Sequence, residues 1–166
     1  SANLSFTSGI DSTYDSYVFK FYNIHPATDN VQFLFNMSSD SGSNYNVTKT
    51  TTYFLAEHNA TGGSANLSYQ SAKDLAQSTD FQKLMTDLGN AADENLSGYL
   101  TIYNPSSTTF VKNFMSRTNA QAYSATNISF DNYIAGYGNT TSAVNAVQFK
   151  MSSGTFDGVI KLYGVS

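Results

Sequence analysis

Polar and apolar residues alternate along much of this chain with a period of two residues. The run 16–24 carries Tyr17, Phe19 and Phe21 at every second position, and the run 31–37 repeats the pattern with further Phe residues. Successive side chains of a β-strand point to opposite faces, so this spacing puts the rings on one side of a strand. The alternation therefore predicts strands that bury one face in a core.

Similar runs, separated by turn signals rich in Pro, Gly, Asn and Asp, predict seven more strands. These runs span residues 46–58, 80–87, 96–103, 109–117, 126–137, 144–151 and 158–165. The segment 152–158, SSGTFDG, predicts a tight hairpin between the last two strands. One segment, 68–88, is ambiguous, because Leu75, Leu84 and Leu88 have partly helical spacing. A strand is the favoured prediction for this segment, and a helix is the alternative.

These runs define the expected fold class. The 166 residues fit one domain, 1–166, and no linker or internal repeat divides them. Strands follow one another without the alternation with helices that marks a parallel sheet. The prediction is an all-β protein, an antiparallel β-sandwich of jelly-roll type with about eight to ten strands.

Composition and charge exclude some classes of binding partner. The chain has a formal net charge of -4 and a sequence pI of about 4.8, and its single Arg is Arg117. An acidic chain of this kind has no basic footprint for nucleic acid or for an anionic membrane surface. No apolar run approaches the roughly 20 residues of a membrane-spanning helix. We therefore expect neither nucleic acid nor membrane as a partner.

The residues that carry most catalysis are scarce. The chain has 12 Tyr and 12 Phe, but no Cys and only two His. His58 follows Glu57, and neighbours in a strand point to opposite faces, so the two side chains would not pair. The pattern GxSxG is absent, and the acidic residues are scattered through predicted turns. We expect a protein that is not an enzyme.

Two loops carry oxygen ligands at short spacing. They are DSGSN at 40–44 and GNAADEN at 89–95, and Ca²⁺ favours carboxylate and amide oxygens in such loops. The candidate ligands are Asp40, Asn44, Asp93 and Glu94. Neither loop has the acidic density of an EF-hand, and Asp in a turn also caps its own backbone. Two interpretations of these residues therefore remain: they bind Ca²⁺, or they cap the backbone of their own turns.

Tyrosines near turn signals are the candidate binding residues. Tyr133 and Tyr137 lie in NYIAGYGNTT, and Tyr45 follows the DSGSN turn. An exposed Tyr offers a rigid apolar ring and a polar hydroxyl, which suits sugar-binding loops and protein interfaces. The alternative is that these rings pack at a sheet edge.

Three blocks of the chain carry a resemblance to a known family. They are IDSTYDSYVFKFYNIHPATDNVQFLF at 10–35, YLTIYNPSSTTFVKNFMS at 99–116 and AVQFKMSSGTFDGVIKLYGV at 146–165. These blocks resemble virion structural proteins of tailed phages, especially marine ones. The most specific part is SSGxFxGxIxLYG in the last block. The resemblance covers nearly the whole chain and implies jelly-roll-like modules of head-decoration or tail-fibre and appendage type, without catalytic residues.

The resemblance implies that this protein is a virion component, on the outer surface of a head or of a tail appendage. It would decorate or cement the capsid by contact with major capsid or fibre subunits, and it would form a homo-oligomer, with a trimer the favoured symmetry. The expected contact residues are Leu34, Val111 and Met115. The alternative is a receptor-binding module of a tail fibre or appendage that recognises host glycan in the manner of a lectin.

Overall fold

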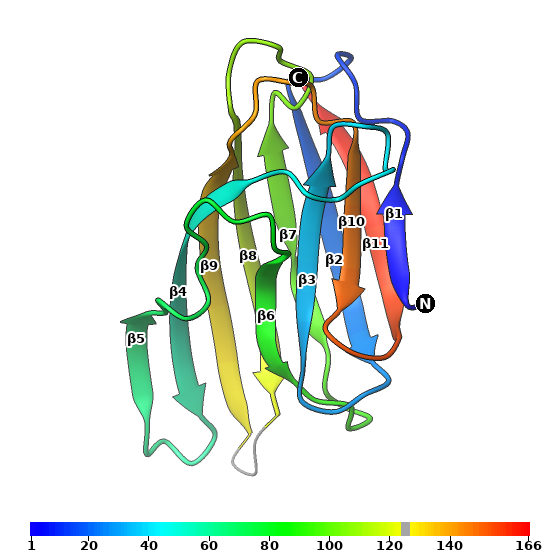
Figure 1. Cartoon of the computed structure of the whole chain (residues 1–166). Coiled ribbons are helices and arrows are strands. Elements are labelled where there is room, and N and C mark those ends of the chain that lie inside the picture. Colours follow the sequence, from blue (N-terminus) through cyan, green and yellow to red (C-terminus); the bar gives the residue numbers. More distant parts are fainter. Residues whose placement is uncertain (124–126) are drawn as a thin grey trace.

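A computed structural model describes residues 1–123 and 127–166, which form eleven β-strands (Figure 1). The strands are β1 (Asn3–Phe6), β2 (Ser16–Pro26), β3 (Val31–Ser38), β4 (Lys49–Asn59), β5 (Ala65–Tyr69), β6 (Gln82–Leu88), β7 (Leu96–Tyr103), β8 (Lys112–Ala122), β9 (Ile128–Gly138), β10 (Ala146–Met151) and β11 (Phe156–Val165). The described residues contain no helix long and apolar enough to cross a membrane.

The strands form two layers. One layer has the order β1-β10-β3-β6, and the other has the order β11-β2-β7-β8-β9-β4-β5. The two layers are connected by backbone pairing at one position, where Leu88 of β6 pairs with Ala122 of β8. In Figure 1 the four-stranded layer lies in front of the seven-stranded one. Every pairing is antiparallel, so the predicted antiparallel β-sandwich is confirmed, while the jelly-roll topology stays a prediction.

Aromatic rings fill the space between the two layers. The ring of Phe149 in β10 lies 5.2 Å from Phe19 and 5.3 Å from Phe21, both in β2. Phe33 and Phe35 of β3 flank the same ring at 5.8 and 6.5 Å. All five side chains are at most 1% exposed. The alternating rings therefore point into the core, as the sequence pattern predicts.

The ambiguous segment contains a strand and no helix. β6 begins at Gln82, and Leu84, Met85 and Leu88 are all fully buried. Two irregularities in the pairing of β6 with β3 break its period of two, which explains the partly helical spacing. Before β6, residues 70–81 run along the free edge of β4, where Lys49 and Ser78 exchange backbone hydrogen bonds of 2.8 and 3.0 Å.

The remaining expectations for strands hold with two exceptions. β1 and β5 are short strands that the sequence pattern did not predict. The tight hairpin at 152–158 is wrong, because β10 pairs with β1 and β3 whereas β11 pairs with β2 in the other layer. The connection crosses the sandwich, so that Met151 and Phe156 both enter the core. The predicted start of the strand 126–137 lies outside the described residues.

The interior also holds polar groups at one end. Lys49 is fully buried, and its Nζ donates to Asn36 Oδ1 at 2.6 Å and to the Val47 carbonyl at 2.7 Å. Asn36 is itself fixed by its amide, which donates to the carbonyls of Tyr45 and Thr79 at 2.6 and 2.9 Å. Burial lowers the pKa of Lys49 to about 7, and the charge of Asp80 opposes that effect.

This buried lysine predicts a stability that increases with pH. Between about 7 and the ordinary lysine value of 10.5, the unfolded chain binds a proton that folded Lys49 lacks. The unfolding free energy should therefore rise as pH increases across that window, with a slope of at most about 1.4 kcal/mol per pH unit for one proton. Urea denaturation of the wild type and of Lys49→Met from pH 7 to 9.5 measures this slope.

Other lysines set the control for this experiment. Burial also lowers the pKa of Lys73 and Lys112, so the wild type contains their contributions of the same sign. The informative quantity is the difference in slope between the wild type and Lys49→Met. Lys150→Met, a change at a partly exposed lysine, should keep the wild-type slope. Equal slopes in the wild type and Lys49→Met would show that Lys49 does not titrate in this window.

Candidate binding face on the seven-stranded sheet

One row of large side chains crosses the outer face of the seven-stranded sheet. Direct cross-strand pairing joins each member of the row to the next, from β5 at one edge to β11 at the other. Neighbouring strands are about 4.8 Å apart, so the row runs perpendicular to the strands. Its members, in order, are Tyr69, Phe54, Tyr133, Arg117, Tyr99, Lys20 and Lys161.

The row is exposed because the opposite positions fill the core. Phe54, Tyr99 and Tyr133 are 43, 43 and 40% exposed, which is unusual for side chains of this size. The chain neighbours Tyr53, Leu100 and Ile134 point inward and are at most 2% exposed. The period of two in each strand therefore produces both the core and this face. The face points away from the viewer in Figure 1.

Arg117 and Asp131 form the electrostatic centre of the face. Arg117 Nε donates to Asp131 Oδ1 at 3.0 Å, and Nη2 donates to Oδ2 at 2.6 Å. This two-point geometry is specific to a guanidinium with a carboxylate. These hydrogen bonds lower the pKa of Asp131, and they raise the pKa of Arg117. The carboxylate is thereby held ionised, and the guanidinium is fixed in position.

Tyr133 is locked by the same pair. Its ring lies 4.8 Å from the Arg117 guanidinium carbon, and its hydroxyl donates to Asp131 Oδ2 at 3.0 Å. That hydrogen bond raises the pKa of the Tyr133 hydroxyl, and the charge of Asp131 adds to the effect. A guanidinium over an aromatic ring is an attractive contact. The ring therefore presents a fixed surface to whatever binds here.

Shallow hollows adjoin the row. One, of about 340 Å³, is lined by Thr50, Asn113 and Tyr137, and a second, of about 320 Å³, by Phe54, Tyr99 and Tyr133. The two hollows share the side chains of Thr52, Met115 and Ala135. Ala135 faces outward between Tyr133 and Tyr137, so a small residue stands where a large one would fill the space. The hollows therefore follow β9 from one Tyr to the other.

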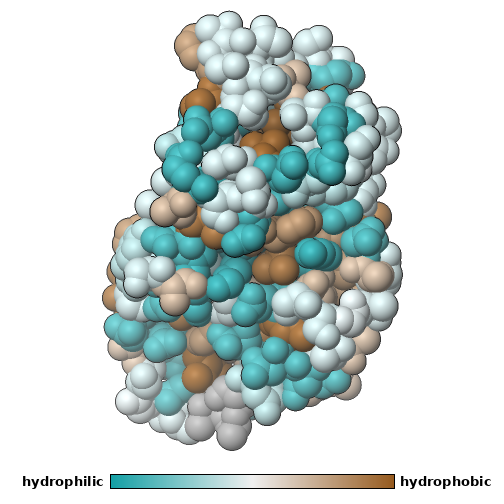
Figure 2. Space-filling model, viewed as in Figure 1, coloured by the Kyte–Doolittle hydropathy of each residue, from teal (hydrophilic) through white to brown (hydrophobic). Residues whose placement is uncertain are grey.

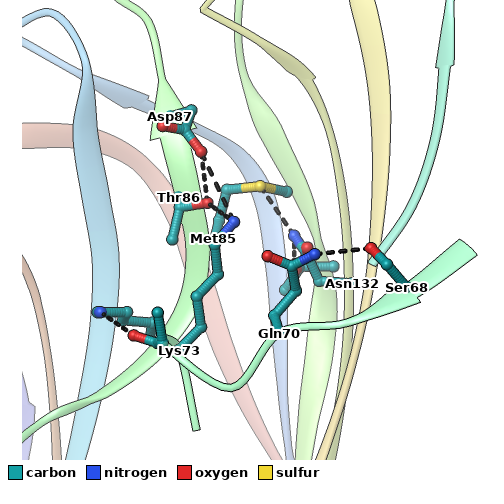
Figure 3. A network of polar contacts seen from close by, with 10 residues as sticks. Ser68, Gln70, Lys73, Met85, Thr86, Asp87 and Asn132 are labelled. Atoms are coloured by element: carbon teal, nitrogen blue, oxygen red, sulfur yellow. Dashed lines mark hydrogen bonds and ion pairs between the residues drawn. The ribbon is translucent and has the colours of Figure 1, made fainter. Parts of the chain in front are cut away.

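The inner side of β9 is anchored beneath this face. Asn132, between the outward Asp131 and Tyr133, is fully buried, and its Nδ2 lies 2.9 Å from the Met85 sulfur (Figure 3). Figure 3 also shows the Lys73 ammonium beside Thr86 and Asp87; the Nζ donates to Thr86 Oγ1 at 2.8 Å. The contact of Asn132 with Met85 ties β9 to β6 of the other layer, and the contacts of Lys73 tie the segment before β6 to the same strand. The central part of the face therefore rests on a fixed support.

The opposite side of the molecule is different. On the face that carries β3, β6 and β10, hydrophobic residues show as separate patches among hydrophilic ones (Figure 2). Lys83 and Lys150 flank Leu34 there, and the Lys150 ammonium lies 4.1 Å from the centre of the Phe81 ring. Among the described residues, the unbroken row of large side chains thus belongs to the seven-stranded sheet.

The predicted binding tyrosines divide between two places. Tyr133 and Tyr137 lie on the outer face and line the hollows. Tyr45 lies elsewhere: its hydroxyl is buried and packs close to Gly42, in the loop that joins β3 to β4. Tyr45 therefore lies apart from the face that Tyr133 and Tyr137 share, and a binding role for these tyrosines stays a prediction.

The predicted Ca²⁺ ligands are not brought together. Asp40 and Asn44 follow the end of β3, whereas Asp93 and Glu94 follow the end of β6, which pairs antiparallel with β3, so the two loops lie at opposite ends of the sandwich. Asp40 accepts hydrogen bonds from Ser38 Oγ at 2.6 Å and from the Asn44 backbone at 2.9 Å, which lower its pKa to about 2.

Glu94 serves its own loop in a similar way. It is 7% exposed, and its Oε2 accepts a hydrogen bond of 2.9 Å from the Ala91 backbone. Within residues 1–123 and 127–166, no three His, Asp or Glu side chains gather as a metal site would require. Asp40 and Glu94 each cap the backbone of their own loop, in line with the alternative interpretation.

The predicted contact residues also lie apart. Leu34 is on the four-stranded layer and is only 8% exposed, so it offers little surface to a partner. Met115 is 55% exposed on the seven-stranded face, and Val111, 37% exposed, precedes β8. These three residues therefore do not make one contact surface.

Phe54, Tyr99 and Arg117 are members of this face that were not predicted from the sequence. Each occupies an outward position in a strand that the pattern predicted, so the alternation could have marked them as exposed. What it could not supply was the register that aligns them with Tyr133.

Comparisons of this chain with protein-family models, with curated proteins and with solved structures found no match.

The ion pair at the centre of the face gives a direct test of its geometry. In Arg117→Gln the pKa of Asp131 should rise, because two hydrogen bonds to the carboxylate are lost and its partial burial favours the neutral form. Carboxyl ¹³C NMR across an acid titration measures this change. Asp40, whose pKa depends on Ser38 and Asn44, should titrate as in the wild type. An unchanged Asp131 titration would contradict the pair.

Proposed function

We propose that this protein is a non-catalytic binding module and that the outer face of its seven-stranded sheet binds a glycan chain. The observation that carries the proposal is the part of the row from Phe54 to Tyr99, in which three aromatic rings and a fixed guanidinium adjoin two connected hollows.

The chemistry of a sugar matches this face. A pyranose ring has apolar C–H patches, which pack on aromatic rings, and hydroxyl groups, which both donate and accept hydrogen bonds. Phe54, Tyr99 and Tyr133 supply the rings. Thr52 and Asn113 place hydroxyl and amide groups beside the hollows. The repeat of rings and polar groups over several strands suits a chain of sugars better than a single small ligand.

The carboxylates of the face favour binding over hydrolysis. A glycosidase uses two carboxyl groups on opposite sides of the bond that it cleaves. On this part of the sheet Asp131 is the carboxylate beside the hollows, and Arg117 and Tyr133 occupy its oxygens. Such an acid positions neighbouring side chains and is poorly placed to donate a proton.

The resemblance to phage virion proteins gives this function a setting. A receptor-binding module of a tail fibre or appendage would use a glycan-binding face of this kind against a host surface. The virion location, the decoration or cement role on a capsid, the jelly-roll topology and the homo-oligomer all stay predictions. Immunogold electron microscopy of intact particles tests the location, since label on heads would favour decoration and label on tails would favour adhesion.

Binding to a glycan array, followed by titration of the strongest ligand, tests the function. Tyr133→Ala should weaken binding about tenfold, the equivalent of about 1.4 kcal/mol, because the ring at the centre of the row is lost. Phe81→Ala is the matched control: the Phe81 ring lies beside the Lys150 ammonium of β10, in the opposite layer, and its loss should leave affinity unchanged. Equal loss in both variants would show that binding does not depend on this face.

A second variant adds volume instead of removing it. Ala135→Leu should fill the space that the two hollows share and block binding, while the unfolding free energy stays near the wild-type value because this side chain faces outward. No binding to any glycan by the wild type, together with self-association that Ala135→Leu abolishes in sedimentation experiments, would mean that the face binds a second copy of the chain.

A further inference from the structure

Two lysines stand directly opposite each other on the same face. Lys20 of β2 pairs in register with Lys161 of β11, and both are exposed. The Cβ atoms of directly opposite residues in an antiparallel pair are about 4.5–5.5 Å apart. Like charges at such positions destabilise the sheet, so this arrangement has a cost in the free protein.

Tyrosines surround this lysine pair. The Lys20 ammonium lies 5.4 Å from the centre of the Tyr163 ring, and the Lys161 ammonium lies 5.6 Å from the centre of the Tyr22 ring. Tyr99, a member of the row, pairs directly with Lys20. The rings hold the ammonium groups by cation–π contacts, but they do not neutralise the charge.

The carboxylates of this face lie near other basic groups. Asp131 is bound by Arg117, and Asp157, exposed at the start of β11, lies 3.9 Å from His25 Nδ1, which pairs with it only when the imidazole is protonated. Within the described part of the chain, no ion pair joins Lys20 or Lys161 to an acidic side chain. Two positive charges therefore stand together on a chain whose formal net charge is -4.

We propose that Lys20 and Lys161 form an anionic subsite, which binds a carboxylate or sulfate group of an acidic polysaccharide. This inference rests on the proposed function and names its ligand class. An anion between the two ammonium groups would convert their repulsion into attraction, and Tyr22, Tyr99 and Tyr163 would pack against the sugar that carries it. The rings on β4 and β9 would then contact neutral parts of the polysaccharide. The lysines on β2 and β11 would bind its charged groups.

An array with neutral, uronate-bearing and sulfated glycans tests the subsite. Binding should be confined to the acidic glycans, and an increase in NaCl from about 50 to about 500 mM should weaken it several-fold, because salt screens exposed charges. The double variant Lys20→Gln/Lys161→Gln should lose at least tenfold in affinity for those glycans. Binding to uronates alone or to sulfated glycans alone identifies the group that the subsite accepts.

The matched control is Lys83→Gln/Lys150→Gln, which removes the two lysines that flank Leu34 on the opposite layer. It should bind as the wild type does, which separates a local site from net charge. Relative to the wild type, the melting temperature of Lys20→Gln/Lys161→Gln should rise as salt is lowered, because the repulsion that salt screens is removed. A difference from the wild type that does not change with salt would contradict the repulsion on which the subsite is argued.

The outcomes separate this inference from the proposed function. Neutral glycans bound as well as acidic ones, or acidic glycans bound equally by the wild type and Lys20→Gln/Lys161→Gln, would overturn the subsite and leave the glycan-binding face intact. The absence of any glycan ligand would overturn both. Loss of neutral and acidic binding alike in Tyr133→Ala, with loss of acidic binding alone in Lys20→Gln/Lys161→Gln, would support both.

Discussion

The packing of Phe149 between the two layers is the contact on which the rest of this structure depends. Its ring meets Phe19 and Phe21 of the seven-stranded layer, as well as rings of its own layer. Burying a ring of this size stabilises the fold by about 1.5–3 kcal/mol. Once these rings are fixed inside, the period of two leaves the alternate side chain of every strand outside. The outer face of the seven-stranded sheet therefore consists of the side chains that alternate with those of the core.

Precision on that face comes from polar contacts on both sides of β9. Arg117 and Asp131 hold each other and the Tyr133 hydroxyl outside, and Asn132 fixes the strand inside. A ring held by a fixed guanidinium and carboxylate loses little conformational entropy when a ligand binds. Small side chains complete the surface, because Ala135 leaves the hollow that the neighbouring tyrosines border.

Much of the fold was predictable from the sequence because strand periodicity is a local property. The strands that contain Phe19, Phe33 and Tyr99 follow from alternation and turn signals alone. The hairpin at 152–158 was not predictable in this way. SSGTFDG has the composition of a tight turn, and only the burial of Met151 and Phe156 in one core sends the chain across the sandwich. β5 was missed because its five residues are largely exposed and lack the alternating pattern.

By itself the sequence determined the all-β class and the inward side of most strands. Only the tertiary structure decided which exposed residues are neighbours. Arg117 and Tyr133 are separated by a chain reversal, and Lys20 and Lys161 by nearly the whole chain, yet strand register sets each pair side by side. Register depends on how all strands share one core, so no local pattern can specify it. For the same reason Asp40 and Glu94, similar in their loops, lie at opposite ends of the molecule.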